Sequence, residues 1–114
     1  MQNFKVIFPG GYKIKDIAND NIDLNIVLMD GSVFFATFFT ITNIKGLMQK
    51  DHLVCFWATD MLIIKDLGKN TIRSAIIEII DRGYFQYCFS KIGTIEKVYL
   101  GKKIYDEIID NLTS

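Results

Sequence analysis

The dipeptide Asp30-Gly31 constrains the fold of this chain most strongly, because it stands between two long runs typical of β-strands, Ile22 to Met29 and Ser32 to Ile41. Asp-Gly favours a two-residue type I′ turn, since both central residues of that turn take positive φ angles. The sequence therefore predicts an antiparallel hairpin in which Leu28 lies opposite Val33. A three-residue loop with a bulge would shift this pairing by one residue.

The predicted register assigns two faces to the hairpin. One face is apolar except for Thr37 and is expected to face the main core. Its apolar residues are Ile22, Leu24, Ile26, Leu28, Val33, Phe35 and Phe39. The second face mixes Asp23 and Asn25 with Phe34 and Phe38. Because a deep core would not hold both polar side chains unpaired, this mixed face is a candidate interface.

Other apolar runs predict further strands. Phe4 to Phe8 alternates and ends at a Pro-Gly-Gly turn, and Tyr12 to Ile17 is expected to return beside it. Val54 to Trp57 and Met61 to Ile64 are apolar on both faces, which is typical of central strands covered on both sides. Thr94 to Leu100 also reads as a strand.

Helical spacing of apolar residues predicts helices in the rest of the chain. Thr42 can cap a short helix, and the clearest helix runs from about Thr71 to Arg82, with Gly83 at its C′ position. An amphipathic helix is expected to close the chain between Ile104 and Leu112. Tyr84 to Ile92 fits a strand and a helix equally well, so its secondary structure stays open.

Length and element order together indicate the fold class. A chain of 114 residues with 50% hydrophobic content has the size of one ordinary domain, here residues 1–114. Strands dominate the first two thirds, and helices return later without strict βαβ alternation. We therefore expect an α+β fold with a largely antiparallel sheet packed against two or three helices.

Composition excludes several classes of function. Thirteen Lys and Arg balance thirteen Asp and Glu, so the basic excess that binds phosphates is missing and no nucleic-acid partner is expected. Cys55, Cys88 and the single His52 lack metal-site spacing, which predicts no metal and no other cofactor. We expect both cysteines to be buried free thiols. No signal peptide or membrane-spanning run is apparent, so a cytoplasmic protein without a membrane partner is expected.

No catalytic constellation stands out, and the chain is expected not to be an enzyme. His52 has no recognisable catalytic pattern around it, and Gly10-Gly11 is not followed by a phosphate-binding helix. The segment from Trp57 to Asp60 has two interpretations. In the first, Asp60 belongs to a hairpin turn or its carboxylate accepts backbone N–H bonds; in the second, it is a rim charge beside a tryptophan anchor.

Part of the chain resembles a known class of proteins. The run Val33 to Thr40, followed by Phe56 to Met61 and by an Ile-rich helix ending at Gly83-Tyr84-Phe85, resembles small bacterial immunity proteins of polymorphic toxin and contact-dependent inhibition systems. The resemblance spans roughly Val33 to Ile92 and includes no catalytic motif. It implies a cytoplasmic protein that binds and neutralises one cognate toxin. Members that block nucleases are typically acidic, and the neutral charge here argues against nucleic-acid mimicry.

We therefore expect a protein-binding module whose most concrete form is an immunity protein. The candidate partner-binding residues are Asp23, Asn25, Phe34, Phe38, Trp57 and Asp60. An alternative is a small-ligand-binding or enzymatic domain with an aromatic pocket around Trp57 and Asp60. A third interpretation is a homodimer joined through exposed sheet edges.

Overall fold

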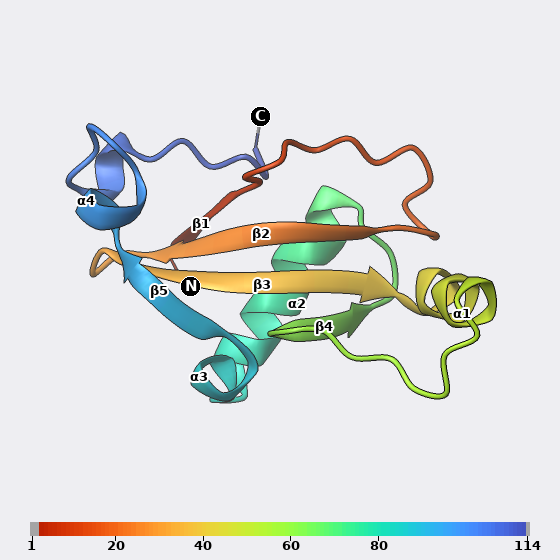
Figure 1. The fold of residues 1–114 in the computed structure, drawn as a ribbon. Helices are drawn as coiled ribbons and strands as arrows, with labels where there is room; N and C mark the ends of the chain where they lie inside the picture. The colour runs from red at the N-terminus through yellow and green to blue at the C-terminus, as the bar shows by residue number, and fades with distance from the viewer. Residues whose placement is uncertain (1–2, 114) are drawn as a thin grey trace.

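A computed structural model describes residues 3–113 of the chain, which form an α+β fold with a mixed five-stranded sheet (Figure 1). In chain order the elements are β1 (Phe4–Ile7), β2 (Asn21–Leu28), β3 (Ser32–Thr40), α1 (Ile41–Lys50), β4 (Met61–Ile64), α2 (Lys69–Asp81), α3 (Phe85–Cys88), β5 (Ser90–Thr94), α4 (Ile95–Val98) and the 3-10 helix η1 (Tyr105–Glu107). The expected α+β class is confirmed.

Strand β3 organises the sheet. Strands β1, β2 and β3 are antiparallel neighbours; the β2–β3 pair is the predicted hairpin, whereas β1 was expected beside Tyr12 to Ile17 and pairs with β2 instead. On its other side β3 pairs with two strands: β4 runs parallel to its C-terminal half, and β5 runs antiparallel to its N-terminal half. Strands β4 and β5 therefore start near the middle of β3 and run apart, as Figure 1 shows.

The central hairpin is confirmed, but the predicted register is wrong by one residue. Val33 lies opposite Val27, not Leu28. The cause is the loop, which has three residues between β2 and β3 because the Gly31 N–H donates to the Leu28 carbonyl (3.0 Å) and Gly31 takes a φ of 89°. A three-residue hairpin loop with glycine in the left-handed region is a common alternative to the two-residue turn.

The main core lies between the sheet and α2, which lies behind the sheet in Figure 1. The strands contribute alternate residues to this face, and α2 contributes Ile72 and Ile76, which are fully buried. Phe8, which follows β1, also belongs to this core. The strands contribute Phe4, Val6, Ile22, Leu24, Ile26, Ala36, Phe38 and Ile64. An isoleucine-rich helix has weak intrinsic propensity, so this packing is what stabilises α2.

A second, smaller cluster covers only the hairpin end of the opposite face. Val27 and Val33 point to this face and contact Ile95 of α4 and Ile108. All four side chains are buried. Figure 1 shows α4 and the C-terminal segment gathered at this end of the sheet.

The C-terminal segment also closes the outer edge of β1. The Val6 N–H donates to the Asp110 carboxylate (3.0 Å), and the Val6 carbonyl accepts from the Asn111 N–H (2.7 Å). The Phe8 N–H donates to the Asn111 side-chain oxygen (3.0 Å). Asp110 in turn forms an ion pair with Arg73 of α2 (3.6 Å). These contacts take the place of a sixth strand.

Two of the expected helices are present, and so are the strands expected at the start of the chain and at Met61–Ile64. Helix α1 begins at Ile41 because Thr40, not Thr42, is its N-cap: the Thr40 hydroxyl accepts from the Asn43 N–H (3.3 Å). Helix α2 is followed by Gly83 with a φ of 78°, as expected for a C′ glycine. The strand at Met61–Ile64 is present, but it lies at an edge of the sheet, not at its centre.

Elsewhere local pattern and structure disagree. Tyr12 to Ile17 and Val54 to Trp57 are not strands, and the expected strand from Thr94 to Leu100 is largely replaced by helix α4. The expected closing helix from Ile104 to Leu112 contains only η1, because Asp110 and Asn111 hydrogen-bond to β1. The ambiguous stretch from Tyr84 to Ile92 holds both structures, α3 and most of β5.

Candidate functional site

The expected grouping of Phe34 and Phe38 with Asp23 and Asn25 on one hairpin face is wrong, because the observed register separates the phenylalanines from the polar residues. Phe34 and Phe38 lie on the α2 side of the sheet, opposite Ile26 and Ile22. Asp23 lies on the other face, opposite Thr37. Asn25 instead pairs with Phe35, so the face of Asp23 still mixes polar and aromatic residues but with different phenylalanines, and a one-residue shift at the turn is the reason.

The two polar residues of the predicted site have partners. The Thr37 hydroxyl donates to the Asp23 carboxylate (3.0 Å), and Asp23 is exposed. Asn25 is buried, and its amide donates to the Tyr99 hydroxyl (2.8 Å). Burial raises the pKa of Tyr99, while the bond from Asn25 acts in the opposite direction. Asn25 thus attaches β2 to the segment that follows α4.

The two phenylalanines of the predicted site belong to the core. Phe38 is 0% exposed, so a partner could reach it only by unfolding the domain. Phe34 is partly buried and packs edge-on against Phe85 of α3, with 4.8 Å between ring centroids. Edge-to-face aromatic pairs of this kind stabilise the fold through packing.

Asp60 connects the starts of β4 and β5. Its carboxylate accepts from the Ser90 hydroxyl (2.9 Å), and its carbonyl accepts from the Thr37 N–H of β3 (3.0 Å). Asp60 has a φ of 52°, a left-handed conformation that aspartate tolerates better than most residues. These contacts favour the turn interpretation of Asp60 and place it where the two strands diverge.

Trp57, unlike the other predicted site residues, lies in an exposed segment. We term this segment, from Leu53 to Trp57, the 53–57 loop. Val54 is 98% exposed and Trp57 is 77% exposed. Within residues 3–113, no backbone-to-backbone hydrogen bond involves positions 54–59. The loop is attached through Phe56, whose ring packs edge-on against Phe39 of β3 at 4.9 Å between centroids.

The edge strand beside this loop adds a further exposed apolar side chain. Ile63 of β4 is 55% exposed and pairs in register with Phe39, the residue that Phe56 covers. The 53–57 loop and Ile63 therefore lie on the same side of the sheet, opposite α2. Sequence reasoning did not find Val54 or Ile63, because it assigned both to buried central strands.

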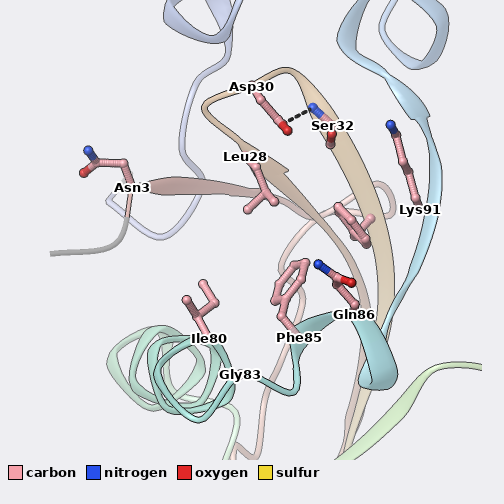
Figure 2. Close-up of a pocket in the computed structure, with 10 residues that line it drawn as sticks. Asn3, Leu28, Asp30, Ser32, Ile80, Gly83, Phe85, Gln86 and Lys91 are labelled. Atoms are coloured by element: carbon pink, nitrogen blue, oxygen red, sulfur yellow. Dashed lines mark hydrogen bonds between the residues drawn. The ribbon is translucent and has the colours of Figure 1, made fainter.

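Residues 3–113 also form hollows on the surface. The one drawn in Figure 2 has a volume of about 480 Å³ and lies between the hairpin end and the C-terminal end of α2. Leu28, Ile80 and Phe85 point into it, and Lys91 and Ser32 line the far wall. Two others, of about 410 and 310 Å³, lie beside the C-terminal segment and beside the Pro9 turn. Neither Trp57 nor Asp60 lines any of these three hollows.

The cysteine prediction needs correction. Both thiols are free, but Cys55 is exposed in the 53–57 loop and Cys88 is half-buried, so neither is a fully buried apolar residue. Among residues 3–113, no group of three or more His, Cys, Asp or Glu side chains could hold a metal ion. His52 is exposed just after α1, as expected for a surface histidine.

Comparison with protein-family models, with curated proteins and with solved structures found no match. In the described part of the chain, no helix is long and apolar enough to cross a membrane.

Proposed function

We propose that this domain is a protein-binding module and that the 53–57 loop, together with Ile63, is its contact surface. The observation that carries this proposal is the exposure of Trp57 (77%) and Val54 (98%) beside Ile63 (55%). Tryptophan is enriched at the energetic centre of protein interfaces, where it fills a pocket of the partner. A folded domain gains nothing in stability from a tryptophan in water, so binding is the better account of this residue.

The partner we propose is a cognate protein toxin. The reason is the resemblance of Val33 to Ile92 to bacterial immunity proteins, a segment that includes the whole 53–57 loop. In this proposal the domain covers a surface of the toxin and performs no chemistry of its own. The side chains that contribute are apolar, so the interaction depends on fit and buried area more than on charge.

The test uses the product of the gene next to this one as the candidate toxin. We expect that the purified domain binds that protein and that its co-expression protects cells from it. Trp57→Ala should weaken binding by about 30-fold or more, as the loss of a hot-spot side chain does. Tyr87→Ala is the matched control, because Tyr87 is an 84% exposed aromatic residue on α3.

Both variants should unfold at the same temperature as the original protein, since neither side chain is packed in the core. Equal affinities of the Trp57 and Tyr87 variants would refute the proposed surface. If the domain neither binds the neighbouring gene product nor protects against it, the toxin assignment is wrong.

A further inference from the structure

Within the described residues, the outer edge of β4 has no partner strand, as is also true of the outer edges of β1 and β5. Strand β4 pairs with β3 on one side only. Its sequence, Met-Leu-Ile-Ile, contains no lysine or proline, the residues that commonly protect exposed edges. An unprotected apolar edge is a template for pairing with another strand.

The register identifies which backbone groups face outward. The Thr37 N–H donates to the Asp60 carbonyl, and Thr37 is aligned with Met61. In a parallel ladder, alternate residues of a strand bond to the same neighbour, so Leu62 and Ile64 face β3. The N–H and C=O groups of Met61 and Ile63 therefore point away from β3. In residues 3–113, no backbone hydrogen bond from outside the sheet reaches either residue.

The 53–57 loop does not fill this edge, although its sequence is typical of a strand. Phe56 packs against Phe39 on the face opposite α2, and within residues 3–113 no backbone-to-backbone hydrogen bond joins positions 54–59 to β4. The left-handed conformation of Asp60 and its bond to Ser90 fix the turn that joins the loop to β4. The outward backbone groups of Met61 and Ile63 therefore have no hydrogen-bond partner in this loop, although the loop carries exposed apolar side chains.

We propose that the β4 edge receives an extended strand of the partner protein, which bonds through its backbone to Met61 and Ile63. Side chains of that strand on the loop side of the sheet are apolar and contact Ile63 and Trp57. This inference rests on the proposed function and specifies how the partner binds, namely by addition of a strand to the sheet.

The length of β4 favours a strand from another protein over a second copy of this chain. Four residues span only about 13 Å. Two copies joined through β4 alone would bury far less than the roughly 800 Å² per partner that a stable interface needs. A different protein can add a strand and also cover Trp57 and Val54, which enlarges the contact.

The first test removes one outward backbone donor. Ile63→Pro lacks the N–H that would bond to the added strand but breaks no bond to β3, and proline is tolerated on edge strands. Ile63→Thr is the matched control, because it changes the side chain and retains the N–H. We expect a loss of affinity of about 30-fold or more for Ile63→Pro and of less than about fivefold for Ile63→Thr.

The second test needs no variant and stands even if Ile63→Pro fails to fold. In the free protein, hydrogen exchange should be fast at the Met61 and Ile63 amides and slow at the Leu62 and Ile64 amides. Binding should slow exchange at Met61 and Ile63 by at least about tenfold.

The outcomes separate the two proposals. If Trp57→Ala weakens binding while exchange at Met61 and Ile63 is unchanged, strand addition is wrong and the protein-binding function stands. If Trp57→Ala has no effect, the proposed surface fails and strand addition fails with it. If the isolated domain sediments as a dimer with these two amides protected, the occupant is a second copy, which overturns the inference.

Discussion

The outer edges of β1 and β4 differ in how their backbone groups are covered. At β1, Asp110 and Asn111 provide two side-chain acceptors and one backbone donor for Val6 and Phe8. At β4, Met61 and Ile63 have no such cover in the described residues. The comparison shows that this chain can close an edge without a further strand. The open edge beside exposed Trp57 is therefore the stronger candidate for an interface.

The largest effect is expected from reopening the closed edge. Asp110→Ala removes the acceptor of the Val6 N–H, and Val6 is fully buried. A buried donor without a partner costs about 1 to 3 kcal/mol, and the ion pair to Arg73 is lost as well. Urea denaturation should show a loss of about 2 to 3 kcal/mol in the free energy of unfolding.

Asp110→Asn is the control for this change, because the amide oxygen can still accept from Val6. It should cost clearly less than Asp110→Ala. Equal losses for the two variants would show that the charge, and not the hydrogen bond to β1, is what closes the edge.

At the open edge a similar change should have little effect on folding. Ile63→Lys replaces a 55% exposed side chain and adds a charge of the kind that protects natural edges. Surface changes of this type alter stability by about 0.5 kcal/mol or less, so the urea midpoint should barely move. Binding to the partner should be lost. A fall in stability as large as that of Asp110→Ala would mean that the β4 edge is already covered.

The sequence predicted what depends on local pattern and missed what depends on tertiary contact. The hairpin, α2 and the strand of Met61 to Ile64 follow from turn chemistry and periodicity. The register depended on whether the loop has two or three residues, which Asp30-Gly31 alone does not decide. That one-residue difference moved Phe34 and Phe38 from the candidate surface into the core.

The same difference between local pattern and tertiary contact explains which residues of the proposed contact surface the sequence could predict. An apolar run such as Val54 to Trp57 predicts burial, and here only Phe56 among its four residues packs against a strand. Places where a strand-like sequence is left unpaired are expected at functional positions. Trp57 was named from its residue type, whereas Val54 and Ile63 required the structure.

The two cysteines should differ in how fast their thiols react in the native protein. Cys55 lies in the exposed 53–57 loop and Cys88 is half-buried in α3. Thiol titration of the native protein should therefore find one fast-reacting group, and two after denaturation. A bulky maleimide on Cys55 should block partner binding and leave the unfolding temperature unchanged. Two fast thiols in the native state would contradict the packing around Cys88.

The smallest expected effect concerns pH and the segment that closes the β1 edge. The Glu107 carboxylate accepts from the N–H groups of Lys103 (2.8 Å) and Ile104 (3.1 Å), and these two bonds lower its pKa. A folded-state pKa below the unfolded value of about 4.3 means that the stabilisation is complete above that pH. It is lost as the pH falls through the lower, folded-state pKa.

This predicts a local transition that NMR can follow. The amide proton signals of Lys103 and Ile104 should shift together at a pH below about 4.3, the unfolded value for glutamate. In Glu107→Gln, which keeps an acceptor but does not titrate, the two signals should not move in this range. Because Glu107 is exposed, the effect on global stability should be small and should weaken further in salt. A midpoint at or above the usual glutamate pKa would show that these bonds do not hold the segment in solution, and that Asp110 and Asn111 close the edge without them.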